Sequence, residues 1–121
     1  MILVDTHVLL WALADDPRLT QRMRQILQGA EQRFLSAVSI WEIEIKRALG
    51  KLWLEDDIVD IAGRTGFTPL AITWDHAAEA GRLPAHHADP FDRLLIAQAR
   101  TEALPILTAD RQFATYDVTL A

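Results

Sequence analysis

The sequence contains no cysteine, which excludes disulfide bonds and thiol chemistry and fits a reducing compartment. It also lacks an apolar run long enough to span a membrane, and no basic residues precede the short apolar start at residues 1–4. We therefore expect a cytoplasmic protein with neither a signal peptide nor a membrane partner. Repeats, low-complexity tracts and linkers are absent as well, so the 121 residues are expected to form a single domain.

Basic residues are too few for simple electrostatic capture of nucleic acid. The chain has 17 acidic and 12 basic residues, for a formal net charge of −5. This excess is about what the four carboxylates described below account for, so net charge alone does not exclude RNA. Hydrophobic residues make up 50% of the chain, which is enough for a real core.

Short apolar runs alternate with helical periodicities along the chain, which is typical of βαβ units in a parallel sheet. Strands are expected at residues 2–4, 33–36, 67–71 and 105–108, with a candidate last strand at 118–120. Helices are expected at residues 6–14, 19–28, 37–49, 58–62, 75–83, 90–103 and 111–116. Pro69 should confine its strand to an edge of the sheet. The predicted fold class is α/β, a three-layer α/β/α sandwich with a mostly parallel central sheet.

Four acidic residues stand where burying a charge is costly. Asp5 and Asp110 each follow a predicted strand, at the end where open parallel sheets bind ligands. Glu42 and Asp92 lie on the apolar faces of predicted helices. Carboxylates brought together repel one another unless a cation lies between them, and hard oxygen ligands favour Mg²⁺ or Mn²⁺. The sequence therefore predicts a metal-dependent enzyme.

Each acid also has a purely structural interpretation. Asp5, Asp92 and Asp110 all lie at helix starts, where an acid satisfies free N–H groups and the helix dipole. Glu42 lies a full turn inside its helix, and its one structural partner is Lys46 in an i,i+4 pair, which contributes only about 0.3–0.5 kcal/mol at a surface. The metal-site hypothesis therefore rests on the set of four.

Other side chains near these acids are weaker candidates. Lys46 and Arg93 are candidate phosphate contacts, although exposed helix cations are usually only solvated. His86 and His87 are expected to be solvated loop residues rather than metal ligands. The four tryptophans, Trp11, Trp41, Trp53 and Trp74, are expected to be core or interface anchors rather than base-stacking platforms.

Four segments resemble the motifs of a known family, in the family's order. They are residues 3–11 (LVDTHVLLW), 36–43 (SAVSIWEI), 89–99 (DPFDRLLIAQA) and 107–111 (LTADR). Together they resemble the PIN-domain nucleases, and specifically the VapC-like toxins of bacterial toxin–antitoxin pairs. The resemblance extends from residue 1 to about residue 113.

This resemblance implies that Asp5, Glu42, Asp92 and Asp110 bind Mg²⁺ or Mn²⁺, with Thr6 and Thr108 as supporting hydroxyls. It implies hydrolysis of RNA phosphodiester bonds, an antitoxin partner and self-association as a homodimer. The apolar region of Trp41, Trp53 and Leu54 could offer a groove to an antitoxin helix or could instead complete the core. Asp89 is expected to cap the helix that starts at Pro90, without a ligand role.

Two other functional classes are compatible with parts of this pattern. A receiver-like signalling domain also has an acidic Mg²⁺ pocket on a parallel sheet, but its first strand should end in adjacent acids and its last strand should precede a lysine. A non-catalytic binding module is the second alternative, in which all four acids are caps or ion-pair partners.

Overall fold

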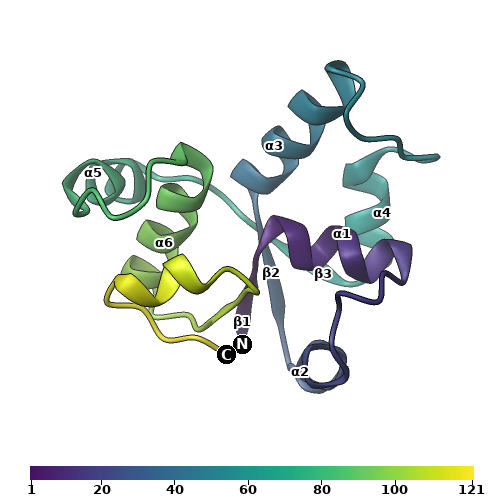
Figure 1. Ribbon diagram of the computed structural model, residues 1–121, viewed down its shortest axis with the longest axis horizontal. Coiled ribbons are helices and arrows are strands. Elements are labelled where there is room, and N and C mark those ends of the chain that lie inside the picture. The colour runs from purple at the N-terminus through teal and green to yellow at the C-terminus, as the bar shows by residue number, and fades with distance from the viewer.

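A four-stranded sheet runs through the centre of the molecule (Figure 1). The computed structural model describes residues 1–121. The strands are β1 (Ile2–Val4), β2 (Arg33–Ser36), β3 (Phe67–Leu70) and β4 (Ile106–Leu107), in the spatial order β3-β2-β1-β4. All neighbouring strands pair in parallel, and Pro69 lies in the edge strand β3. The predicted parallel sheet and the edge position of Pro69 are therefore confirmed.

Helices fill the intervals between the strands. They are α1 (Thr6–Ala14), α2 (Gln21–Gly29), α3 (Ala37–Ala48), α4 (Ile58–Arg64), α5 (Trp74–Arg82) and α6 (Pro90–Glu102), followed by the 3-10 helix η1 (Arg111–Thr115). The predicted helices are all present, and none of their ends differs from the prediction by more than two residues. No helix is long and apolar enough to cross a bilayer.

The predicted strand at 118–120 is wrong. This segment makes one isolated parallel bridge, between Leu120 and Ile106. Because β4 is only two residues long, it offers too little edge for a longer ladder to form.

Hydrophobic cores lie on both faces of the sheet, and the alternation of side chains along β1 feeds both. Ile2 and Val4 belong to a core that includes buried residues of α1, α2 and α4. Leu3 belongs to the other core, which includes buried residues of α6 and η1. Helix α3 contributes Ile43 to the first core and Val38 to the second. The result is the expected sandwich of two helical layers around a parallel sheet.

Three of the four tryptophans are exposed rather than buried. Trp41 is 62% exposed, Trp53 80% and Trp74 94%. Only Trp11 packs partly against a core. The suggestion that Trp41 and Trp53 complete the core is therefore wrong, and both are available to a partner.

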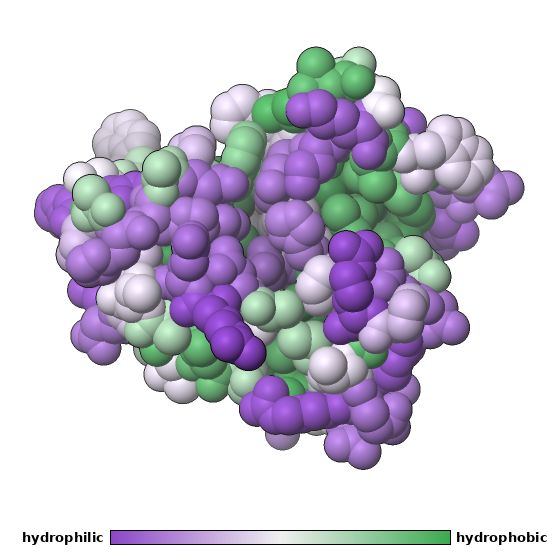
Figure 2. Space-filling model, viewed as in Figure 1, coloured by the Kyte–Doolittle hydropathy of each residue, from purple (hydrophilic) through white to green (hydrophobic).

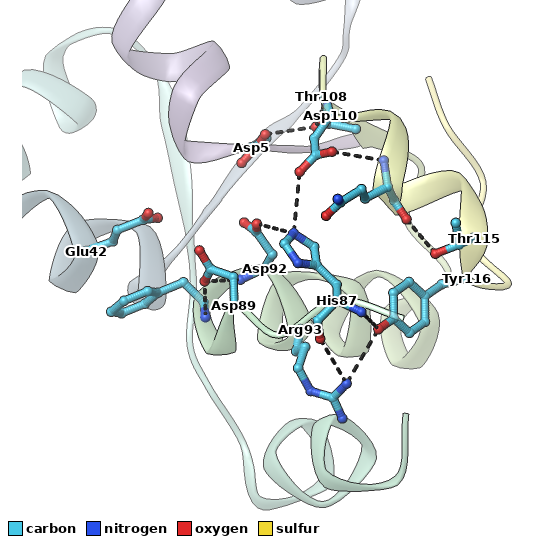
Figure 3. Close-up of polar contacts among 12 residues, drawn as sticks. Asp5, Glu42, His87, Asp89, Asp92, Arg93, Thr108, Asp110, Thr115 and Tyr116 are labelled. Atoms are coloured by element: carbon cyan, nitrogen blue, oxygen red, sulfur yellow. Dashed lines mark hydrogen bonds and ion pairs between the residues drawn. The ribbon is translucent and has the colours of Figure 1, made fainter. Parts of the chain in front are cut away.

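Parallel pairing brings the carboxyl ends of the strands to one edge of the sheet. Helix α1 begins directly after Asp5 at the end of β1, and α3 begins directly after Ser36 at the end of β2. Thr108 follows β4 at the same edge. The predicted functional residues therefore gather at this edge, where the first turn of α6 also lies (Figures 1 and 3).

Candidate metal centre

Asp5 is the acid at the end of the central strand β1, and it does not cap the helix that follows. It holds the N-cap position of α1, but its side chain accepts no capping hydrogen bond. Instead Oδ2 accepts a hydrogen bond from Thr108 Oγ1 at 2.8 Å, while Oδ1 is buried without a hydrogen-bond partner in the protein. The side chain thus keeps one acceptor free inside the protein, which the cap interpretation does not explain.

Glu42 reaches the same region from α3 and is also only partly satisfied (Figure 3). It is buried, and its Oε2 lies 3.4 Å from Lys46 Nζ in the predicted i,i+4 pair. Its Oε1 is buried and has no partner. The lysine therefore accounts for one carboxylate oxygen and leaves the other unexplained.

Asp92 and Asp89 lie three residues apart at the start of α6 and are placed as the sequence predicts. Asp89 is the N-cap, and its Oδ1 accepts hydrogen bonds from the backbone N–H groups of Phe91 and Asp92. Asp92 is buried and its side chain points into the acidic cluster (Figure 3). The cap and the inward-facing acid are therefore separate residues.

Asp110 lies at the rim of the cluster and has two roles at once. It caps η1, because its Oδ1 accepts a hydrogen bond from Gln112 N at 2.9 Å. Its own backbone N–H donates to Thr108 Oγ1 at 3.0 Å, and that hydroxyl in turn donates to Asp5. Thr108 therefore joins the two acids that follow β1 and β4.

The side chain of Thr6, unlike that of Thr108, makes its hydrogen bond to a neighbouring helix and not to one of the four acids. Its buried hydroxyl donates to Ser39 Oγ at 2.8 Å and so ties α1 to α3, the helix that carries Glu42. Ser39 is completely buried and was missed in the sequence, because a serine on a helix gives no signal of its own.

His87 is the second residue that sequence reasoning missed, and the prediction that it is a solvated loop residue is wrong. Only 14% of its side chain is exposed, and Nε2 lies 2.8 Å from Asp92 Oδ2 and 3.4 Å from Asp110 Oδ2. His86 does remain exposed at the surface, with its ring against Tyr116. Two adjacent histidines are indistinguishable by residue type, and only the path of the loop separates them.

The candidate phosphate contacts differ from each other. The guanidinium of Arg93 is held by backbone carbonyls: it donates to Pro84, His87, Ala80 and Leu83. Because its donors are used to fix the loop before α6, we do not retain Arg93 as a phosphate contact. Lys46 is one-third exposed beside Glu42, so its role stays a prediction.

The electrostatics of the cluster reflect crowded, poorly solvated carboxylates. Burial raises the pKa of Asp5, although the hydrogen bond from Thr108 opposes this shift. Burial also raises the pKa of Asp92 to about 7, and the neighbouring charges of Asp89 and Asp5 add to the rise while His87 opposes it. Carboxylates in this state favour a bound proton or a bound cation over free ionisation.

The donor set fits a hard divalent cation. Carboxylate oxygens are the ligands that Mg²⁺ and Mn²⁺ prefer, and both Asp5 and Glu42 hold a buried oxygen that no protein group satisfies. His87, Asp92 and Asp110 each place a ligand atom within 4.8 Å of the others. A cation would neutralise the mutual repulsion and use the free acceptors.

Comparison with known proteins identifies the family. Residues 2–118 match the PIN domain. A curated relative, ribonuclease VapC22 of Mycobacterium tuberculosis, is 29% identical over 124 residues, covering 95% of this chain and 91% of the relative.

Solved structures share the fold at lower identity. The VapBC2 complex of Rickettsia felis, bound to a fragment of its promoter DNA, matches with a TM-score of 0.74 and 14% identity, over 100% of this chain and 98% of that one. VapC20 of Mycobacterium tuberculosis, a toxin that cleaves the sarcin–ricin loop, matches with a TM-score of 0.72 and 18% identity, again over 100% and 98%. The chain therefore belongs to the PIN-domain family and, within it, is similar to the VapC-like toxins.

Proposed function

We propose that this chain is a divalent-metal-dependent endoribonuclease and the toxin of a toxin–antitoxin pair. The observation that carries the proposal is the pair of buried, unpartnered carboxylate oxygens on Asp5 and Glu42. The charges of these two acids help to raise the pKa of Asp92, and Thr108 links Asp5 to Asp110 through hydrogen bonds. The similarity to a protein named as a ribonuclease supports RNA as the substrate. Asp5, Glu42, Asp92 and Asp110 are the proposed ligands of Mg²⁺ or Mn²⁺.

The cation, when bound, would position a water, lower its pKa and neutralise charge that develops on the scissile phosphate. The protein's own groups prepare this site. Thr108 orients Asp5 through a hydrogen bond, Thr6 fixes α1 against α3, and Lys46 stands beside Glu42 as a candidate contact for a substrate phosphate. No nucleophilic side chain is needed.

The depth of the carboxylates favours an accessible RNA backbone over a rigid duplex. Asp5 and Glu42 are both at least 95% buried, so a substrate phosphate must approach closely to share a cation with them. Single-stranded or loop RNA meets this requirement more easily than an A-form helix does. Cleavage of the sarcin–ricin loop by VapC20, which shares this fold, is consistent with such a preference.

RNA cleavage with and without a chelator is the direct test. Purified protein should cleave loop-containing RNA in Mg²⁺ or Mn²⁺ and lose this activity in excess chelator. Asp5→Asn should abolish cleavage with the fold intact, because the amide keeps the shape but loses the charge that holds the ion. Full RNA cleavage in excess chelator would contradict the proposal of a metal-dependent nuclease.

The two other functional classes are less well supported. A receiver should have its acids at strand ends, whereas Glu42 and Asp92 lie on helices and a single acid follows β1. A module in which every acid is a cap or an ion-pair partner is inconsistent with Asp5, whose side chain makes no capping hydrogen bond and accepts one only from the neutral hydroxyl of Thr108.

An antitoxin partner is proposed to dock over the outer end of α3 and the segment that follows it. Leu49 and Trp53 are exposed there, and Leu52, Trp53 and Leu54 line a surface groove with Ala48. Figure 2 shows hydrophobic side chains gathered at the top of this face, where α3 ends in Figure 1. Expression without a partner should arrest growth, and harmless expression together with no benefit from Asp5→Asn would contradict the toxin assignment.

Self-association as a homodimer is the last part of the proposal. A separate apolar groove of about 470 Å³ lies between α3, α4 and the edge strand β3, lined by side chains such as Ile40, Val59 and Phe67. An apolar groove on a small protein is a candidate site for a second copy. A monomer at all concentrations in analytical ultracentrifugation would contradict the proposed homodimer.

A further inference from the structure

The imidazole of His87 extends from the loop between α5 and α6 toward Asp92 and Asp110. Its Nε2 lies 2.8 Å from Asp92 Oδ2 and 3.4 Å from Asp110 Oδ2 (Figure 3). Despite these short separations, Nε2 is buried and makes no hydrogen bond of acceptable geometry. The nitrogen and the two oxygens are thus close neighbours that do not point along a shared hydrogen bond.

These separations match those of donor atoms around one cation. Ligands at about 2.1 Å from a six-coordinate ion lie about 3 Å from their nearest neighbours in the coordination sphere. The two Nε2–oxygen distances lie on either side of that value, and all three donor atoms are within 4.8 Å of one another.

Two further acids of the site have free acceptors that a cation could use. Asp5 Oδ1 and Glu42 Oε1 are buried without partners, on side chains that are 3% and 5% exposed respectively at the residue level. The charges of both acids contribute to the raised pKa of Asp92, although neither belongs to the group that His87, Asp92 and Asp110 form. Asp92, which contacts His87 directly, is therefore the acid that links the imidazole to these two partly satisfied carboxylates.

The loop is built to hold the ring in this position. The backbone N–H of His87 donates to Tyr116 Oη at 2.8 Å, and Arg93 donates to the carbonyl of His87 at 3.3 Å. Tyr116 Oη itself donates to Pro84 O at 2.8 Å, and the imidazole packs edge-on against Phe113. These contacts fix the backbone of the loop and, with Phe113, the position of the imidazole.

We infer that His87 Nε2 is a nitrogen ligand of the divalent cation in this site, so that the site binds Mn²⁺ in preference to Mg²⁺. Imidazole nitrogen is a softer donor than carboxylate oxygen, and Mg²⁺ accepts it less readily than first-row transition ions do. This inference rests on the proposed function, because it assumes that the acidic cluster binds a metal.

Mn²⁺ spectroscopy on the full chain tests the inference without measuring turnover. Chelator-treated protein reloaded with Mn²⁺ should show a ¹⁴N coupling by pulsed electron paramagnetic resonance, and this should change to a ¹⁵N coupling when histidine is labelled. His87→Ala should abolish the coupling and weaken Mn²⁺ binding by an order of magnitude or more, with a smaller loss for Mg²⁺. His86→Ala, the adjacent exposed histidine, is the matched control and should keep both.

The outcomes separate the two proposals. Mn²⁺ binding that depends on Asp5 but shows no nitrogen coupling would overturn the role of His87 and leave the nuclease proposal intact. Unchanged Mn²⁺ and Mg²⁺ affinities in a folded His87→Ala protein would have the same meaning. Wild-type protein that binds neither ion would overturn both. The labelling experiment uses the unmodified sequence, so poor folding of a variant does not affect it.

Discussion

Helix α6 contributes to two polar networks that differ in how completely their buried atoms are hydrogen-bonded. Its first turn provides Asp92 to the acidic cluster. Further along, Gln98 and Glu102 join a second network with His76 of α5. There His76 Nδ1 accepts a hydrogen bond from Thr73 N at 3.0 Å, and Nε2 lies 2.8 Å from Glu102 Oε1. Gln98 Nε2 donates to Ala71 O at 3.3 Å.

The two networks differ in which buried atoms have no hydrogen-bond partner. The second network leaves one neutral amide oxygen, Gln98 Oε1, without a partner. The acidic cluster leaves two carboxylate oxygens and an imidazole nitrogen. An unsatisfied buried charge costs far more than an unsatisfied amide, so such a carboxylate favours a bound proton or a bound cation. Both networks contain buried polar residues, so burial alone does not mark the functional site. The unpartnered carboxylate oxygens are what distinguish the acidic cluster.

The largest effect should come from removing a charge from the unsatisfied cluster. Asp92→Asn should lower the rate of RNA cleavage by about 10²-fold or more and weaken Mn²⁺ binding in parallel, because one anionic ligand is lost. Asp89→Ala, three residues earlier, is the matched control and should keep appreciable activity. If Asp89→Ala is the inactive protein and Asp92→Asn merely unstable, the two roles are assigned the wrong way round.

A substitution in the network of His76, Gln98 and Glu102 should lower stability and leave metal binding unchanged. His76→Ala should lower the free energy of unfolding by about 2–4 kcal/mol, because it opens a cavity and leaves buried partners without hydrogen bonds. Its affinity for Mn²⁺, measured below the melting temperature, should match that of the wild type. A loss of metal binding in properly folded His76→Ala would show that the two groups are coupled through α6.

The pH dependence of stability should also separate the two groups. Between the ordinary pKa of 3.8 and about 7, folded Asp92 keeps a proton that the unfolded chain has released. Without metal, this residue therefore makes the protein less stable as pH rises through that window. The advantage of Asp92→Asn over wild type in chelator should grow by about 1–2 kcal/mol between pH 4 and 8, allowing for partial solvent screening. Urea titrations at several pH values would measure it, and a constant difference would contradict the raised pKa.

The smallest effect should come from the helix cap. Asp89→Ala removes the acceptor for two backbone N–H groups of α6 and should lower stability by about 1 kcal/mol. Asp89→Asn should recover most of this loss, since asparagine is an equally favoured cap. Thermal melts of the two variants decide the point: equal losses in both would indicate that charge, not capping, is what Asp89 contributes.

Much of this protein is determined by local sequence. The alternation of apolar runs and helical periodicities indicates the parallel α/β sandwich, because these patterns report which side of each element faces a core. Asp89 followed by Pro90 defines the start of α6 from residue type alone. The four acids stand out because each occupies a position where an uncompensated charge is costly.

Tertiary structure decided which of these residues share a site and which do not. His86 and His87 have the same chemistry, and only the loop fixed by Arg93 and Tyr116 turns one of them into the cluster. The sequence makes Arg93 a candidate phosphate contact, but in the structure its guanidinium donates to carbonyls of α5 and of the loop that follows α5. Sequence specifies which face of an element is buried because that depends on neighbours along the chain, whereas the partner of a polar atom depends on segments that meet only in three dimensions.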